Sequence, residues 1–212
     1  MMTQYGFYFD ATRCTGCKTC ALACKDYKDL NEEIAFRNVI EYGGGEWTDN
    51  GDGTWSTDAY AYYVSVACNH CDDPACTAAC PVGSMVKEDD TGIVHNDPET
   101  CIGCGACVSA CPYGAPALNP QTNVSVKCDL CQDRVQEGKQ PICVEACSLR
   151  ALEFGDIDEL RAKHGSEAVS EIAPLPTADQ TSPNLLIKPP ANAKEPGDET
   201  GAIINTIDVV LG

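Results

Sequence analysis

Residues 101–112 read Cys-Ile-Gly-Cys-Gly-Ala-Cys-Val-Ser-Ala-Cys-Pro, which places four cysteines in a run of eleven residues. Cysteines at every third position suit a tight loop, and the longer step before Cys111 fits one turn of helix. Pro112 then ends that turn, because proline removes a backbone N–H and disfavours helix in the residue before it. The stretch therefore predicts a loop that wraps three thiolates around one centre and carries the fourth away from it.

The remaining cysteines extend this pattern along the chain of 212 residues, which holds sixteen in all, in four groups of four. Group one repeats the C-x2-C-x2-C-x3-C spacing. Group two has the spacing C-x2-C-x4-C-x3-C, and eleven residues separate the second and third cysteines of group four. In chain order the groups are Cys14, Cys17, Cys20, Cys24; Cys68, Cys71, Cys76, Cys80; Cys101, Cys104, Cys107, Cys111; and Cys128, Cys131, Cys143, Cys147.

Three chemistries use an even number of cysteines: disulfides, zinc sites and iron–sulfur clusters. Disulfides need Cα atoms about 4.4–6.8 Å apart with convergent side chains, and two such runs of eleven residues would strain the loops. Structural zinc takes four thiolates in a tetrahedral site, and group four by itself fits zinc as well as iron. Groups one and three match the bacterial ferredoxin run, whose fourth cysteine serves the other of two clusters. Sixteen thiolates, at four for each cluster, predict four [4Fe–4S] clusters.

Charge and hydropathy exclude several classes of partner. Lys and Arg total 14 against 32 for Asp and Glu, which gives a formal net charge of −18 and makes nucleic acid a poor partner. The apolar runs fall short of the 18 or more residues that a membrane span needs. The first ten residues lack the basic and apolar regions of a secretory signal. We therefore expect any membrane or export link to come through a partner.

Several segments, together with the cysteine frame, resemble the four-cluster iron–sulfur subunits of complex iron–sulfur molybdoenzymes. They are RCTGCKTC at 13–20, CNHC at 68–71, CPYGAP at 111–116 and APLP at 173–176. The resemblance implies a non-catalytic electron-transfer subunit between a quinol-oxidising integral membrane anchor and a molybdopterin catalytic subunit, at the periplasmic face of the inner membrane. It favours respiratory dimethyl sulfoxide reduction, with polysulfide, thiosulfate or tetrathionate reduction as alternatives. A zinc-binding structural scaffold is the remote alternative.

The same resemblance implies how four clusters would share the cysteines, in sets that we call sites 1 to 4. Spacing supports the exchange of fourth cysteines between neighbouring sites, but it does not by itself pair the groups. Cysteine at position 104, where related nitrate reductase subunits have a tryptophan and a three-iron cluster, implies four complete cubes. The sets are Cys14, Cys17, Cys20, Cys147 (site 1); Cys24, Cys128, Cys131, Cys143 (site 2); Cys68, Cys71, Cys76, Cys111 (site 3); and Cys80, Cys101, Cys104, Cys107 (site 4).

The expected fold is α+β, with two nested bacterial-ferredoxin-like units that each hold two clusters, an inserted β-hairpin and an extended C-terminal arm. Strands are predicted at Ile34–Tyr42 and Ala59–Val66, around a turn-rich stretch. Leu185-Leu186-Ile187, in the proline-rich arm, is expected to lie on a neighbouring subunit, since it would otherwise be exposed. The expected divisions are 1–66 (first half of the outer unit and hairpin), 67–118 (inner unit), 119–155 (second half of the outer unit) and 156–212 (short helix and arm).

The short helix has recognisable ends. Asp156-Ile157-Asp158-Glu159 resembles a capping box, which predicts that the helix begins after Asp156. Gly165 is the expected C-terminal cap.

Basic residues are distributed unevenly around the groups. Eight of the fourteen flank groups one and four, whereas residues 64–118 contain only Lys87. Positive charge favours the reduced, more negative form of a cluster, so we expect the outer pair, sites 1 and 2, to have the higher mean potential. The alternative is that partner subunits neutralise these charges.

The three histidines and the two tryptophans are not expected to bind a cluster. His70, His95 and His164 are not expected to ligate metal, because cysteines fill every position, although His70 could donate a hydrogen bond to sulfur. Trp47 and Trp55 bracket the turn at 50–53 and are expected to serve packing or an interface.

Overall fold

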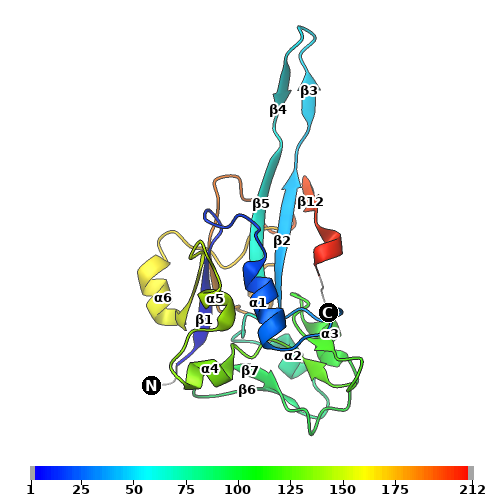
Figure 1. The fold of residues 1–212 in the computed structure, drawn as a ribbon, viewed down its shortest axis with the longest axis vertical. Helices are drawn as coiled ribbons and strands as arrows, with labels where there is room; N and C mark the ends of the chain where they lie inside the picture. Colours follow the sequence, from blue (N-terminus) through cyan, green and yellow to red (C-terminus); the bar gives the residue numbers. More distant parts are fainter. Residues whose placement is uncertain (1–2, 210–212) are drawn as a thin grey trace.

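Strand β1 (Tyr5–Asp10) is the centre of a three-stranded sheet, with β10 (Leu152–Asp156) antiparallel on one side and β11 (Leu185–Lys188) parallel on the other (Figure 1). This computed structural model describes residues 3–209. Successive side chains of β1 point to opposite faces of the sheet and pack into two separate cores. Phe7 and Phe9 face the main core, and Tyr8 packs on the opposite face. The sheet therefore brings the start of the chain together with two segments from its last third.

Helix α6 (Ile157–His164) covers the second face of this sheet, where Leu160 packs with Tyr8. The Asp156 carboxylate accepts hydrogen bonds from the backbone N–H groups of Asp158 and Glu159, at 2.9 and 3.3 Å. The predicted N-terminal cap is confirmed, and the helix ends at Gly165 as expected.

A second sheet carries the long hairpin. Strands β2 (Arg37–Gly44) and β5 (Tyr60–Ala67) pair antiparallel over their whole length, and β12 (Gly201–Ile203) adds to β2. The strands predicted here are thus present, and β2 begins and ends slightly later than expected. Beyond them the chain continues into β3 (Trp47–Asp49) and β4 (Trp55–Thr57), which project away from the body in Figure 1.

Short helices carry most of the cysteine groups. Helix α1 (Thr19–Tyr27) contains the end of group one and continues beyond Cys24, because Lys25 follows where groups two and three have proline. The other helices are α2 (Ala75–Ala78), α3 (Ala106–Ala110), α4 (Gln132–Gln136) and α5 (Ile142–Glu145). Two small hairpins connect them, β6 (Met85–Lys87) with β7 (Val94–Asn96) and β8 (Ala117–Leu118) with β9 (Ser125–Val126).

The expectation that Leu185-Leu186-Ile187 lies on a neighbouring subunit is wrong. These residues form most of β11, and their exposed fractions are 3%, 6% and 0%. Parallel pairing with β1 satisfies their backbone and buries both faces, and nothing local in the sequence reports so distant a pairing. Before it reaches β11, the chain passes over the second sheet, where the Tyr62 hydroxyl donates to the Ala173 carbonyl at 2.8 Å. Two 3-10 turns, Ala178–Gln180 and Thr206–Asp208, complete the arm.

The two tryptophans of the hairpin do not pack within the described part of the protein. The exposed fractions of Trp47 and Trp55 are 66% and 59%, so packing, one of the two roles expected for them, is not observed. Within residues 3–209, no helix has the length and apolar character to cross a bilayer.

Candidate metal centres

All sixteen cysteines are free thiols in the structure, and no two are bridged. They lie at the ends of short helices and in the loops before them. Residues 3–209 contain no group of three or more His, Cys, Asp or Glu side chains arranged to hold a single metal ion. The thiols of sites 1 and 3 surround cavities.

The four cysteines of site 1 line one cavity, with Cys14 and Cys17 in the loop, Cys20 on α1 and Cys147 from the end of group four. The loop turns tightly at Gly16, whose φ is +69°, and a Cβ there would lie 2.3 Å from the Tyr63 ring. Only glycine combines that backbone conformation with so close an approach.

Site 3 is built in the same way around a cavity lined by Cys68, Cys71, Cys76 and Cys111. Asn69 also lines the cavity, and its buried side-chain Nδ2 has no hydrogen-bond partner among the described residues. A buried donor without a partner is costly, so the wall of this cavity is suited to an occupant that accepts hydrogen bonds.

Site 2 is the most enclosed of the four. Cys24, Cys128, Cys131 and Cys143 are all buried, and α1 packs on α5 to bring the first and last of them together. Burial raises the pKa of the Cys128 thiol well above its usual range, and the pKa of Cys24 rises to about 12. The Cys143 and Cys131 sulfurs are close enough to Cys24 to raise its pKa further, and Cys143 also raises the pKa of Cys131.

Site 4 differs from site 2 in that two serine side chains contact its cysteine sulfurs. The Cys80 sulfur lies 3.4 Å from the Ser84 hydroxyl, and the Cys107 sulfur lies 3.2 Å from the Ser125 hydroxyl. The backbone N–H of Ser125 also donates to the Cys101 sulfur at 3.5 Å. The Ser84 hydroxyl lowers the pKa of Cys80 to about 7. Cys104, the remaining member, is exposed.

The thiols of sites 1 and 3 show why a metal fits these cavities. Burial raises the pKa of Cys14 and Cys76 to about 11 and that of Cys71 to about 12. Thiolates at these positions need a nearby positive charge, and a coordinated metal deprotonates a thiol outright. The donor set is therefore chemically suited to iron–sulfur clusters, which cysteine thiolates hold.

The four sites form a row. Cys20 of site 1 lies near Cys143 of site 2, close enough for their charges to interact. Cys68 of site 3 and Cys128 of site 2 share one buried cluster. Sites 3 and 4 meet where Cys76 packs in one buried cluster with Cys107.

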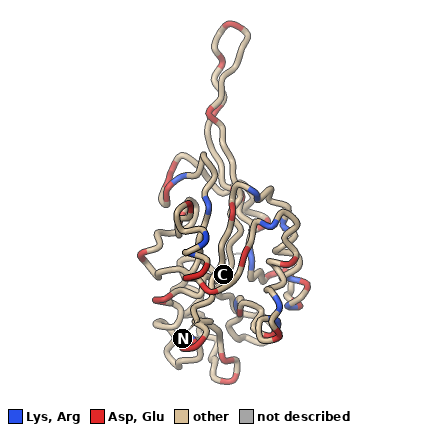
Figure 2. The backbone as a smooth tube through the Cα atoms, turned by 90° about the vertical axis from the view of Figure 1, so that its left-hand side faces the viewer, with Lys and Arg blue, Asp and Glu red and all other residues tan. Residues whose placement is uncertain are grey.

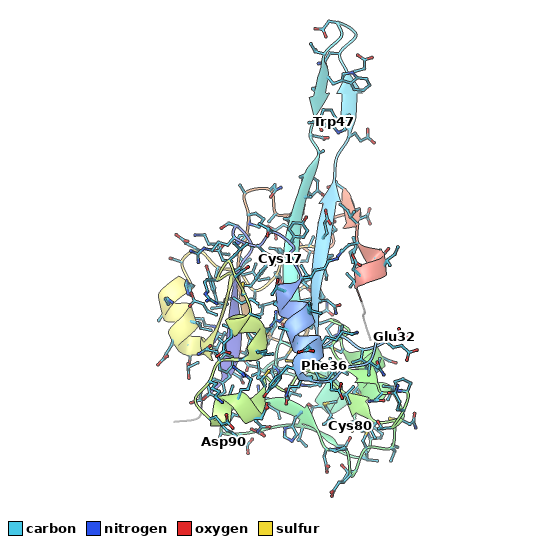
Figure 3. The ribbon with its side chains drawn as sticks, viewed as in Figure 1. Cys17, Glu32, Phe36, Trp47, Cys80 and Asp90 are labelled. Carbon is cyan, nitrogen blue, oxygen red and sulfur yellow. The ribbon has the colours of Figure 1, made fainter. Side chains whose placement is uncertain are left out.

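The two ends of this row reach the surface. Cys17 and Cys104 are the exposed cysteines, and they belong to sites 1 and 4. Figure 3 shows Cys17 near the point where the long hairpin leaves the body and Cys80 of site 4 near the opposite end.

The three histidines lie outside these cavities. His70 is buried, and its Nδ1 accepts a hydrogen bond of 2.9 Å from the backbone N–H of Val94. His164 stacks on the Tyr8 ring, with the ring centroids 3.6 Å apart, and His95 lies 3.4 Å from the Glu88 carboxylate.

Three serines and one arginine were missed from the sequence, and one of the serines is Ser65, whose hydroxyl lies 3.4 Å from the Cys20 sulfur of site 1. Ser84 and Ser125 contact site 4 from β-hairpin segments, and no cysteine spacing marks them. Arg37 is 3% exposed at the start of β2, yet the uneven distribution of basic residues did not single it out. A charged residue at the start of a strand was the only available signal, and that position usually faces solvent.

Comparison with known proteins agrees with this geometry. A 4Fe-4S dicluster domain model matches residues 59–157, and a 4Fe-4S binding domain model matches residues 11–28. The B subunit of the anaerobic dimethyl sulfoxide reductase of Escherichia coli (strain K12) is 57% identical over 209 residues, covering 99% of this chain and 100% of the relative. The corresponding subunit of Haemophilus influenzae is 54% identical over 208 residues, covering 98% of this chain and 100% of the relative.

A more distant relative is similar over a shorter part of the chain. The thiosulfate reductase electron transfer subunit PhsB of Salmonella typhi is 38% identical over 160 residues, covering 75% of this chain and 79% of its own. The near-complete matches extend over the C-terminal arm as well as the cysteine groups. This protein therefore belongs to the family of iron–sulfur B subunits of anaerobic dimethyl sulfoxide reductases.

Proposed function

We propose that this chain is the electron-transfer subunit of a respiratory dimethyl sulfoxide reductase, in which four [4Fe–4S] clusters pass single electrons from a quinol-oxidising membrane anchor to a molybdopterin catalytic subunit. The observation that carries the proposal is the row of four cysteine sets, in which an exposed cysteine marks each end, Cys17 in site 1 and Cys104 in site 4. A row open at both ends suits transfer between two partners.

The chain's own residues would hold and insulate the clusters. Sites 1 to 4 would each supply four thiolates, in the sets defined above, so that no coordination position stays open for a substrate. Apolar side chains such as Phe9 and Val94 line the cavities and exclude water. Because every ligand is a cysteine and none is left over, we assign the chain no catalytic residue.

The organisation proposed from the sequence accompanies this function. Sites 1 and 2 would form an outer ferredoxin-like unit built from residues 1–66 and 119–155, and sites 3 and 4 an inner unit at 67–118, with 156–212 as the following segment. The packing of α1 on α5 supports the pairing of groups one and four. The complex would lie at the periplasmic face of the inner membrane, attached through its anchor subunit.

The choice of dimethyl sulfoxide over other acceptors rests on the relatives. Identities of 54–57% over nearly the whole chain belong to dimethyl sulfoxide reductase subunits, against 38% for the thiosulfate reductase subunit. Residues beyond the cysteine groups contribute to the difference, and these are the residues available for contact with a specific catalytic subunit.

Anaerobic purification and elemental analysis test the cofactor. We expect a brown protein that bleaches on reduction and contains sixteen irons and sixteen acid-labile sulfides for each chain, with little zinc. A colourless protein with two to four zinc ions would instead establish a zinc scaffold. For the acceptor, the reduced complex should be reoxidised by dimethyl sulfoxide and not by thiosulfate, tetrathionate or polysulfide.

A further inference from the structure

Arg37 is a fully enclosed cation between two of the proposed cluster sites. It opens β2, and 3% of its surface is exposed. The guanidinium lies over the Phe7 ring, with its central carbon 4.7 Å from the ring centroid. Its Nη1 donates to the Ser65 hydroxyl at 3.1 Å and to the Ser65 carbonyl at 3.3 Å. Strand pairing fixes this arrangement, because Ser65 lies across from Val39, two residues along β2.

The opposite edge of the guanidinium has no partner among the described residues. Nε and Nη2 are both buried there without a hydrogen bond. These two nitrogens form one edge of the planar fork, the edge that binds an acceptor side-on. Leaving the donors of a buried charge unpaired is costly, so a native fold keeps this arrangement only if an anionic acceptor faces it.

The surroundings identify the chemistry of that acceptor. The charged groups that act most strongly on Arg37 are the sulfurs of Cys143, Cys20, Cys128 and Cys24, and within residues 3–209 no carboxylate forms an ion pair with it. Cys20 belongs to site 1 and the other three belong to site 2. Ser65 connects the same cation to site 1 directly, because its hydroxyl lies 3.4 Å from the Cys20 sulfur.

We propose that Arg37 is a positioning residue that raises the reduction potentials of the outer pair, sites 1 and 2, by directing the free Nε–Nη2 edge of its guanidinium at the sulfurs held there. This inference rests on the proposed function. Reduction adds one negative charge to a cluster, so a fixed neighbouring cation and its N–H donors favour the reduced form. The Phe7 ring and the Ser65 contacts keep the guanidinium in place through the change in charge.

The inner pair has no equivalent residue among those described. Lys127 is buried beside sites 2 and 3, where its positive charge opposes the rise in pKa that burial causes at Cys128, Cys76 and Cys111. Its Nζ donates to the carbonyls of Val94 and Cys128. Lys127 therefore acts on both pairs, and Arg37 is the buried cation that distinguishes the outer pair from the inner one.

Potentiometric titration followed by EPR, on the purified anaerobic complex, tests the proposal. Arg37→Met keeps the bulk of the side chain and removes its charge and donors. We expect two of the four midpoints to become more negative by about 59 mV or more, a tenfold loss of electron affinity for a one-electron couple, and the other two to stay in place. Arg37→Lys, which keeps the charge without the fork, should recover part of the shift. Arg161→Met, on the exposed surface of α6, is the matched control and should change no midpoint.

Three results would overturn the inference: unchanged midpoints in Arg37→Met, an equal shift of all four, or Arg37→Lys giving the same midpoints as Arg37→Met. Should Arg37→Met fail to assemble, Arg37→Lys and Ser65→Ala decide the question, since either should still lower the potential of at least one cluster. A complex that contains no iron would refute the proposed function itself. Full iron content with unmoved midpoints would refute only the role of Arg37.

Discussion

Cys68 and Cys128 belong to different cysteine groups, and they pack into one buried cluster together with Ala67. Each lies at the start of its group, and their sulfurs are close enough that Cys68 raises the pKa of Cys128 beyond the effect of burial. The contact joins site 3 to site 2. It is the point at which the two halves of the row meet, and charge introduced or removed there acts on both.

Lys127 is the charge already present at that junction. Lys127→Met leaves the Val94 and Cys128 carbonyls without their donor, and each buried unsatisfied group costs about 1–3 kcal/mol. We expect a lower free energy of unfolding, together with more negative midpoints for one cluster of each pair. Chemical denaturation of the cluster-loaded protein and EPR titration measure the two effects.

The control for this change is Lys139→Met. Lys139 is exposed and pairs with the nearby Glu137, so its loss should alter neither stability nor midpoints measurably. If Lys127→Met had the same free energy of unfolding as Lys139→Met, the hydrogen bonds of Lys127 to the two carbonyls would not contribute to stability.

Asn184 connects the C-terminal arm to the loop of group two. Its side chain is fully buried, and Nδ2 donates to the His70 carbonyl at 2.9 Å and to the Asp72 carboxylate at 3.0 Å. Asn184→Ala should lower the free energy of unfolding by about 1–3 kcal/mol, because it removes a buried donor from the His70 carbonyl. Since His70 lies between two cysteines of site 3, we expect iron bound there to leave faster when a chelator is added.

Iron release is followed by absorbance under anaerobic conditions. Asn192→Ala is the matched control, because Asn192 makes one long hydrogen bond, 3.3 Å, to the Ala61 carbonyl at the surface. Equal rates of iron loss in the two variants would contradict a role for the arm in holding the loop.

These contacts show where sequence reasoning succeeded and where it could not. Spacing within a group is local, and a loop of two-residue steps followed by a helical turn has few possible shapes, so the cysteine groups could be recognised as cluster-binding runs. A cap residue such as Asp156 binds backbone N–H groups within the next three residues, so it could also be recognised from the local sequence.

Non-local contacts could not be read in this way. The sequence predicts that residues 185–187 lie on a neighbouring subunit, and this is wrong because a proline-rich stretch gives no sign that it will pair in parallel with β1. Arg37 and Ser65 lie on strands that a long insertion separates, so their hydrogen bonds depend on a register that the sequence does not specify.

Gly103 sits in the loop of group three with φ at +67°, and a Cβ there would lie 2.2 Å from the Asn123 carbonyl oxygen. Gly138 has a similar φ of +73°, but a Cβ would meet nothing within 4 Å. Alanine at either position has the same backbone penalty, about 1–3 kcal/mol. Only Gly103→Ala adds a clash that displaces backbone, so it should lose the cluster of site 4 while Gly138→Ala keeps full iron content.

Elemental analysis and the EPR spectrum of the reduced protein distinguish these results. We expect about four fewer irons for each chain in Gly103→Ala, because one [4Fe–4S] cluster would be missing. If both variants lost iron to the same extent, the strained backbone conformation alone, and not the clash with Asn123, would cause the loss.

The projecting hairpin is the remaining surface for which the structure suggests a role. Residues 46–58 extend beyond the body with two exposed tryptophans, and Figure 2 shows acidic residues and no basic ones along this segment. An aromatic pair on an acidic projection is suited to a partner surface with apolar pockets and basic residues around them. We expect it to contact the catalytic or anchor subunit.

Replacing 46–58 with Asn-Gly connects the strands one residue beyond the last pair of β2 and β5, Gly44 with Tyr60, and should leave folding and iron content intact. We expect the shortened protein to lose co-purification with its partner subunits. Trp47→Ala and Trp55→Ala should each weaken assembly about tenfold, since interface tryptophans commonly contribute more than about 1 kcal/mol. Ile207→Ala, at a side chain that is 97% exposed elsewhere on the surface, is the control and should assemble normally. Stoichiometric complex from the shortened protein would show that the hairpin makes no such contact.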